Sequence, residues 1–238
     1  MRVGQELSLA RNKLSTELSL ARNKLFTIGP SLSALHRMRT LDLSGNKIIH
    51  IPDLLAMTCL ERLLLAHNRL TTVPSLEYAL ALQEIDFQAN AVEQMPAMAA
   101  VYTALTRLNM ANNQLQYLDG HIGGCDHLQF LNASGNKIRV VPSEYGRMND
   151  LETLSLESNE IEDFPAALCK IKDVTRMRGL THLLLRENNI KLAEVPSTLP
   201  DLETLQQVDL QGNPMDMYSP LIQKLSKIKP PKGLRAQA

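Results

Sequence analysis

The sequence predicts an α/β solenoid, in which a curved parallel β-sheet lines the inside and loops and short helices cover the convex side. Three observations predict this fold: a short recurring template, a nearly constant spacing between its copies, and an apolar–proline pair after most copies. Self-similarity at a period between 20 and 50 residues is typical of stacked repeats. No copy could bury its own apolar side alone, so the copies must share one continuous core.

The template is L-x-L-x-x-N-x-L, with conservative changes at the leucine positions. After two copies of ELSLARNKL it returns as LDLSGNKI, LLLAHNRL, IDFQANAV, LNMANNQL, LNASGNKI, LSLESNEI, LLLRENNI and VDLQGNPM. Successive template asparagines, starting at Asn12, are separated by 11, 23, 22, 22, 23, 23, 23, 29 and 25 residues. The alternating leucines predict a short strand with one buried face. About nine such strands, stacked at about 4.8 Å, would form a sheet about 40 Å long.

The template asparagine falls where the chain must turn off the strand. Its amide has donors and an acceptor, so it can satisfy backbone groups buried in the turn. We therefore expect a structural ladder formed by Asn23, Asn46, Asn68, Asn90, Asn113, Asn136, Asn159, Asn188 and Asn213.

The return path of each coil follows the asparagine. Pairs such as Ile51-Pro52 and Val141-Pro142 suit a non-sheet path, because proline lacks an N–H. Further on, Leu55, Ile122 and Leu168 are predicted to point inward.

The two ends depart from the period. Residues 6–16 and 17–27 differ only at Ser15 and Phe26, yet a spacing of 11 is too short for a coil. We expect the second copy to form the first strand and residues 1–16 to be an irregular cap or loosely ordered. Residues 17–215 would be the solenoid. In 216–238, Ser219 and Pro220 are predicted to start a capping helix with Leu221, Ile222, Leu225 and Ile228 on its apolar side, followed by a basic tail.

The coil between Asn159 and Asn188 is longer than the others by about six residues. The insertion lies in CKIKDVTRMRGL, residues 169–180. A longer helix on the convex face and a docking loop are both compatible with it, since insertions in repeats map to one face.

The composition of the chain limits the classes of partner and the compartment that we expect. Lysine plus arginine equals aspartate plus glutamate at 25 each, so nothing favours nucleic acid or a membrane as partner. No leader, membrane-length apolar run or N-myristoylation glycine is found. Cys59, Cys125 and Cys169 are odd in number and far apart, which favours the cytoplasm or another reduced intracellular compartment, a ciliary one included.

The sequence contains only weak candidates for a metal-binding or catalytic motif. HIGGCDHL contains His121, Cys125, Asp126 and His127, but zinc needs ligands that converge on one point. Cys125 is predicted to be a core residue and His127 to point outward. We find no P-loop, nucleophile elbow or dinucleotide fingerprint, and expect no metal, cofactor or catalytic residue.

The remaining candidate is the concave face of the sheet, where residues flanking the strand leucines point outward. Arginine and aromatic residues are favoured as binding anchors, and small residues two before the asparagine would leave room for a partner. The predicted partner-binding residues are Arg62, Leu64, Glu84, Asp86, Arg107, Asn109, Phe130, Asn132, His182, Leu184 and Arg186.

The template, followed by an apolar–proline pair at a period of about 23, resembles that of the short intracellular leucine-rich repeat proteins, which include Ras-pathway scaffolds. The stretches MRTLDLSGNKIIHIP and LLLRENNIKLAEVPSTL carry the resemblance, which covers about residues 17–215. It implies a leucine-rich repeat solenoid and a non-enzymatic adaptor or scaffold that binds a protein. The alternatives are a structural subunit of a ciliary or cytoskeletal assembly, engaged through its convex loops, Lys170 to Arg178, and its tail, and a regulator of a phosphatase or small GTPase.

Overall fold

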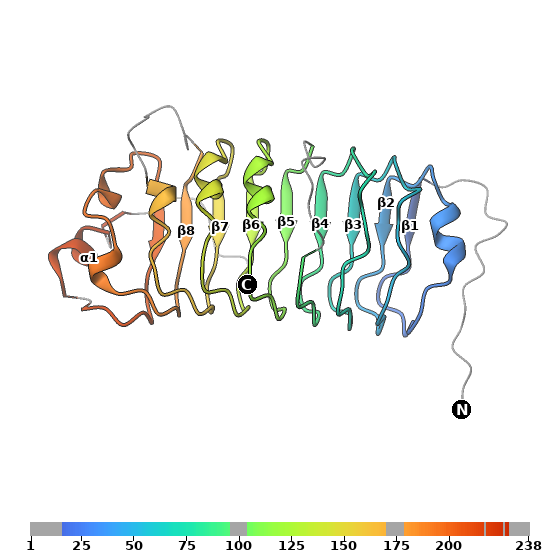
Figure 1. The fold of residues 1–238 in the computed structure, drawn as a ribbon, viewed down its shortest axis with the longest axis horizontal. Helices are drawn as coiled ribbons and strands as arrows, with labels where there is room; N and C mark the ends of the chain where they lie inside the picture. Colours follow the sequence, from blue (N-terminus) through green and yellow to red (C-terminus); the bar gives the residue numbers. More distant parts are fainter. Residues whose placement is uncertain (1–15, 96–103, 170–178, 217, 226, 229–238) are drawn as a thin grey trace.

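Nine parallel strands stack in chain order in the computed structural model, which describes residues 16–95, 104–169, 179–216, 218–225 and 227–228 (Figure 1). The strands have three residues each and pair in one register, so the first residue of each strand lies beside the first residue of the next. They are β1 (Glu17–Ser19), β2 (Thr40–Asp42), β3 (Arg62–Leu64), β4 (Glu84–Asp86), β5 (Arg107–Asn109), β6 (Phe130–Asn132), β7 (Thr153–Ser155), β8 (His182–Leu184) and β9 (Gln207–Asp209). We number each coil by its strand, from coil 1 to coil 9.

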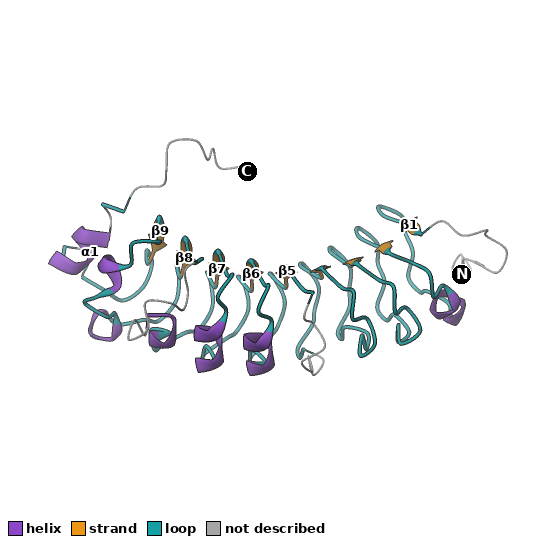
Figure 2. Cartoon of the chain, turned by 90° about the horizontal axis from the view of Figure 1, so that it is seen from above, coloured by secondary structure: helices purple, strands orange, loops and turns teal. Residues whose placement is uncertain are grey.

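Viewed along the strands, the coils form an arc with the strands on its inner side and the helical turns on its outer side (Figure 2). Six of the described outer segments form 3-10 helices: η1 (Pro30–Ala34), η2 (Gly120–Gly124), η3 (Ser143–Arg147), η4 (Ala166–Cys169), η5 (Leu192–Glu194) and η6 (Leu199–Asp201). The predicted solenoid, with a curved parallel sheet inside and short helical turns outside, is therefore confirmed.

The core is one continuous column of apolar side chains between the sheet and the outer turns. The middle residue of strands β2 to β8 is buried in every case, as Leu63 and Leu108 illustrate. The outer turns add Ile122 and Leu168, as the sequence predicted. Leu55 was placed wrongly, because it is 39% exposed while Leu54 fills the inward position. Two leucines are adjacent here in a turn without a helix, so the exact path of the turn decides which of them points inward.

The template asparagines of coils 2 to 9 lie in line along the edge where the chain leaves the sheet. Each Nδ2 donates to carbonyls of its own coil and of the preceding coil, and each Oδ1 accepts an N–H from the preceding coil. For Asn113 the acceptors are the carbonyls of Phe87, Met110 and Ala111 at 3.1 Å, and the donor is the Val92 N–H at 3.0 Å. Every rung thus joins two neighbouring coils.

The residue before each template asparagine adopts a left-handed backbone conformation. Positive φ occurs at Gly45, Gly135 and Gly212, and also at Arg22, His67, Ala89, Asn112, Ser158 and Glu187. Only glycine adopts this conformation without steric cost. Because several residue types occupy this position, the sequence alone did not indicate the left-handed conformation.

The ends of the solenoid differ. The second ELSLARNKL copy supplies β1, while the first copy lies outside the described residues. After coil 9 the chain forms α1 (Pro220–Leu225), whose N-terminus is capped by Ser219 Oγ accepting the Ile222 N–H at 3.3 Å. Ile222 and Leu225 are buried against the last coil.

Replacing Asn113 by alanine is predicted to lower the free energy of unfolding by about 1–3 kcal/mol. The three carbonyls keep other donors, but the buried Val92 N–H loses its partner. Asn23, which is exposed and at the first rung, is the matched control and should cost less. Urea unfolding of both variants measures the difference, and equal costs would contradict the ladder's role.

Replacing Ala89 by glycine is predicted to stabilise the fold by about 0.5–1 kcal/mol. Relief of the left-handed strain, about 1–2 kcal/mol, exceeds the extra freedom that glycine gives the unfolded chain. Gly135→Ala should do the reverse, because its new Cβ would lie 2.4 Å from Asn112 Oδ1. Thermal melts of both variants test the pair.

Candidate binding surface on the concave face

Three columns of side chains run along the concave face, across the strands. Successive members of a column lie on neighbouring coils. The first column contains the first residue of each strand and the second column the last. The third column lies two residues further on, just before the turn, and includes Ala66 and Ala111. Because parallel pairing keeps a single register, each column is a continuous line of neighbours across the sheet.

Four neighbouring side chains in the middle of the first column contact one another. Arg62 Nε lies 2.7 Å from Glu84 Oε2, and Arg107 Nε lies 3.9 Å from Glu84 Oε1. The Arg107 guanidinium also stacks on the Phe130 ring, 4.4 Å from its centroid. We call Arg62, Glu84, Arg107 and Phe130 the central row; they come from β3, β4, β5 and β6.

The side chains of the central row contact one another but remain accessible. The side chains of Arg62 and Arg107 are 51% and 53% exposed, whereas that of Glu84 is 27% exposed. Exposed ion pairs and exposed cation–π contacts each contribute at most about 1 kcal/mol. Two cations on one carboxylate leave the row with one excess positive charge beside an aromatic ring. The row can therefore exchange its internal contacts for those of a partner at small cost.

The second column has a local structural role that the sequence analysis missed. One side-chain oxygen of Asp86, Asn109 and Asn132 accepts the backbone N–H two residues later, at 3.0, 3.3 and 3.0 Å. Asp42 and Asp209 make the same bond. Carboxylate and amide side chains commonly form such turns, which the repeated spacing could have indicated. These predicted binding residues thus fix the end of the strand, and only their remaining polar atoms face a partner.

Burial perturbs two carboxyl groups on this face. Desolvation raises the pKa of Asp86 above its ordinary value of 3.8, and the Gln88 N–H bond offsets part of that rise. Desolvation likewise raises the pKa of Glu157 in the third column, with repulsion from Asp209 adding to it. Both groups are costly to keep charged, so a cationic partner group would be favoured beside them.

The other predicted residues form two further places on the face. Leu64 is half-buried beside the Arg62 end of the central row. His182, Leu184 and Arg186 belong to coil 8 and are separated from the central row by β7. Arg186 Nε donates to Glu187 Oε1 at 3.1 Å. The predicted set is therefore a central row with a separate group near the C-terminal end.

The cysteine–histidine motif lies on the convex side and its side chains diverge. Cys125 is buried and His127 is exposed, as predicted. His121 Nδ1 bonds Asp119 at 2.8 Å, whereas His127 Nδ1 bonds Asp150 of the next coil at 3.1 Å. Within the described residues, no group of three or more histidine, cysteine, aspartate or glutamate side chains could hold a metal ion.

Asp86→Asn is predicted to stabilise the protein at pH 7. The amide oxygen can keep the Gln88 N–H bond, as Asn109 and Asn132 do, without a buried charge. The pKa of Asp86 is raised in the folded state, so the charged carboxylate lowers the stability of the parent protein above that pKa. The parent regains this stability as the pH falls toward 3.8. The difference in melting temperature should therefore shrink between pH 7 and pH 4. A difference that is constant or grows in acid would contradict the assignment.

Comparison with known proteins identifies the repeat. The family model "Leucine rich repeat" matches residues 16–70. Transforming growth factor beta activator LRRC32 of Pongo abelii is 36% identical over 81 residues, covering 33% of this chain and 12% of that protein. A leucine-rich repeat protein of Leptospira interrogans matches with a TM-score of 0.70 and 25% identity, over 84% of this chain and 55% of the other.

Two further structures share the fold. The ectodomain of the Arabidopsis thaliana receptor kinase GASSHO1/SCHENGEN3 has a TM-score of 0.72 and 25% identity, over 83% of this chain and 24% of the other. An internalin from Listeria monocytogenes has a TM-score of 0.72 and 19% identity, over 89% of this chain and 62% of the other. In each case this chain spans less than two thirds of the protein that it matches.

None of the helices in the described ranges has the length and apolar character needed to cross a membrane. Leucine-rich repeats are general protein–protein interaction modules and are typically non-enzymatic. The ten template copies, the nine-stranded parallel sheet and the matching family model agree on one conclusion. The chain folds as a leucine-rich repeat solenoid, and its residues 16–70 match the leucine-rich repeat family.

Proposed function

We propose that this protein is an intracellular adaptor or scaffold that binds a protein partner mainly through its concave face. The central row carries the proposal. It places two arginines, the glutamate between them and an aromatic ring on four adjacent strands at the middle of the sheet. Arginine and aromatic residues are enriched among the residues that dominate binding energy.

The surroundings of the row fit an extended or protruding protein segment. Ala66 and Ala111 in the third column are small and buried, so they leave space beside the long side chains. Leu64 and Phe130 offer apolar contact, and Arg62 and Arg107 can donate to carboxylate or carbonyl oxygens. A partner segment with an acidic residue next to an apolar residue matches this pattern.

Two observations outside the row support the proposal. The receptor ectodomain of Arabidopsis thaliana was solved in complex with CASPARIAN STRIP INTEGRITY FACTOR 2, so a solenoid of this fold holds another molecule there. Cys59 is a free, exposed thiol, which is typical of a reduced compartment. Among the regions expected for assembly through the convex side, residues 170–178 and the tail from 229 onward lie outside the described residues.

The double variant Arg107→Ala with Phe130→Ala tests the proposal. It removes the stacked pair from the face, so capture of partner proteins should fall at least tenfold, equivalent to about 1.4 kcal/mol. The melting temperature should change little, because Arg107 is half exposed and Phe130 lies on the face rather than in the core. Quantitative affinity purification with the parent and the variant measures the loss.

Arg147→Ala is the matched control, since Arg147 is an exposed arginine on the convex side. Partners lost with the concave variant and kept with the control support the concave face. Partners kept with the concave variant would contradict it.

A further inference from the structure

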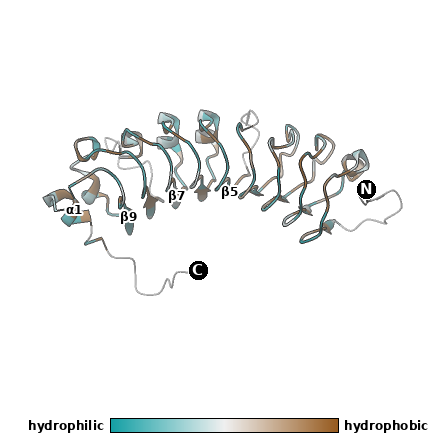
Figure 3. Ribbon diagram, turned by 90° about the horizontal axis from the view of Figure 1, so that it is seen from below, coloured by the Kyte–Doolittle hydropathy of each residue, from teal (hydrophilic) through white to brown (hydrophobic). Residues whose placement is uncertain are grey.

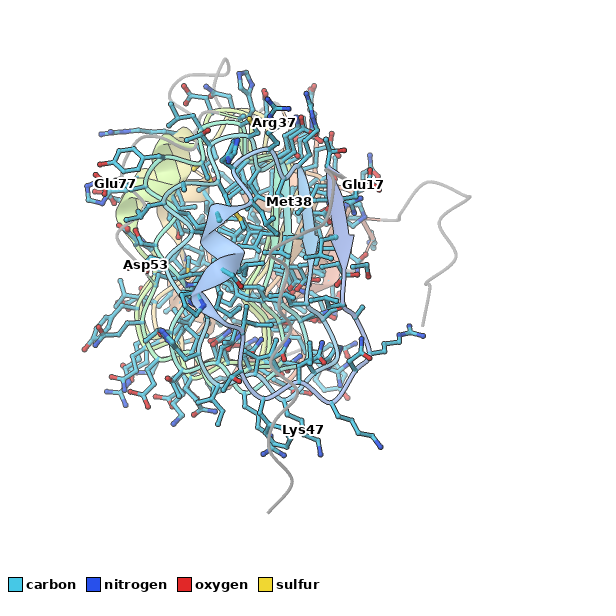
Figure 4. All side chains as sticks on the ribbon, turned by 90° about the vertical axis from the view of Figure 1, so that its right-hand side faces the viewer. Glu17, Arg37, Met38, Lys47, Asp53 and Glu77 are labelled. Carbon is cyan, nitrogen blue, oxygen red and sulfur yellow. The ribbon has the colours of Figure 1, made fainter. Side chains whose placement is uncertain are left out.

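A second surface lies on the edge where the chain leaves each strand. It consists of the exposed, described side chains among the residue before each template asparagine of coils 1 to 9 and the four residues after it, and we call it the turn rim. It runs along the lower edge of Figure 1, and Lys47, which belongs to it, points away from the body of the solenoid in Figure 4. Neither the concave face nor the core uses these exposed side chains.

Charge on the turn rim is divided along its length. In coils 1 to 3 the rim contains Arg22, Lys24, Lys47 and Arg69 and no acidic residue. All four side chains are exposed, and none forms an ion pair with a described residue. Lys47 lies over the Phe26 ring, 5.5 Å from its centroid. The N-terminal third of the rim is therefore an unpaired basic surface.

The opposite charge lies toward the C-terminal end of the same rim. Coil 7 contributes Glu162 and Asp163, both of which are exposed. Glu160 of the same coil is paired with Arg139 of coil 6, at 2.9 Å. Between the two ends, coil 4 carries an exposed Glu93 and coil 6 an exposed Lys137.

Large exposed apolar side chains lie beside the charges at the middle of the rim, as Phe26 and Ile49 do at its basic end. Tyr117 of coil 5 is 76% exposed and Val140 of coil 6 is 65% exposed, which are high values for large apolar side chains. Coil 5 is the central coil of the nine. An aromatic side chain thus stands at the midpoint between the basic and the acidic ends.

We infer that the turn rim binds the turn rim of a second copy of this chain, in an antiparallel dimer with a two-fold axis at coil 5. This axis brings coil 3 against coil 7 of the other copy and coil 4 against coil 6. Arg69 then faces Glu162 and Asp163, and Glu93 faces Lys137, on both sides of the axis. Tyr117 meets its own copy at the centre, which is the self-complementary arrangement that a two-fold interface requires.

The curvature of the solenoid favours the same axis. Viewed onto the turn rim, the coils follow one shallow arc (Figure 3). A two-fold axis that runs from the concave to the convex side reverses the chain direction but keeps both arcs bent the same way, so the rims overlap along their length. A two-fold axis along the solenoid would place like charges together and oppose the arcs. The concave face stays open in this dimer, so the inference does not depend on the proposed function.

The rim is narrow, and its contacts are mostly between exposed charges. Interfaces of small area are weak, and exposed ion pairs are screened by salt. We therefore expect a dimer with a dissociation constant in the micromolar range or weaker, favoured at low ionic strength.

Charge exchange between copies tests the dimer. The acidic variant carries Arg69→Glu, and the basic variant carries Glu162→Lys and Asp163→Lys. Each variant alone brings like charges together, so its association constant should fall at least tenfold. An equimolar mixture of the two should associate again, because both contacts between coil 3 of one variant and coil 7 of the other then join opposite charges. Sedimentation equilibrium of the full chain at low and high salt measures all four samples, including the parent.

Circular dichroism confirms that each variant is folded, and Arg147→Glu on the convex side is the matched control that should dimerise like the parent. The inference is overturned if the parent is monomeric at low salt up to millimolar concentration. It is also overturned if either variant alone dimerises like the parent, or if the mixture of folded variants stays monomeric.

Discussion

Every level of this structure depends on parallel stacking of coils in a single register, held by the asparagine ladder. A three-residue strand has too few backbone hydrogen bonds to define its own position. The ladder supplies the missing contacts at the turn, since each interior amide bonds its own coil and the preceding one. Leucine burial then favours the same alignment, because the inward side chains form a column only when the turns coincide.

The same register creates the two surfaces. On the concave face it brings residues about 22 positions apart into contact, so the central row is a consequence of stacking rather than of local sequence. On the turn rim the same register aligns residues that are far apart in the sequence, so that basic side chains lie toward one end of the edge and acidic side chains toward the other. The two surfaces lie on different sides of the solenoid, so the proposed partner and the inferred second copy would not compete for the same side chains.

The template predicted the strands, the asparagine positions and the outward columns, because each follows from a fixed spacing. It could not predict which outward side chains meet. Glu84 bridges Arg62 and Arg107, and that geometry depends on rotamers. The left-handed position before each asparagine was hidden by Arg22, His67 and Glu187, which tolerate the strain. Leu55 was assigned inward because the return path has no strict period, and the turn rim was overlooked because its charges balance in the overall composition.

Residue-resolved hydrogen exchange tests the role of the ladder most directly. The N–H groups of Leu70, Val92, Leu115 and Ile138 lie in turns and donate only to the Oδ1 atom of the next coil's asparagine. If the ladder holds the coils together, these turn amides exchange as slowly as the amides of β4 to β6. Exchange as rapid as in exposed loops, with the strands still protected, would show that the coils stack without it.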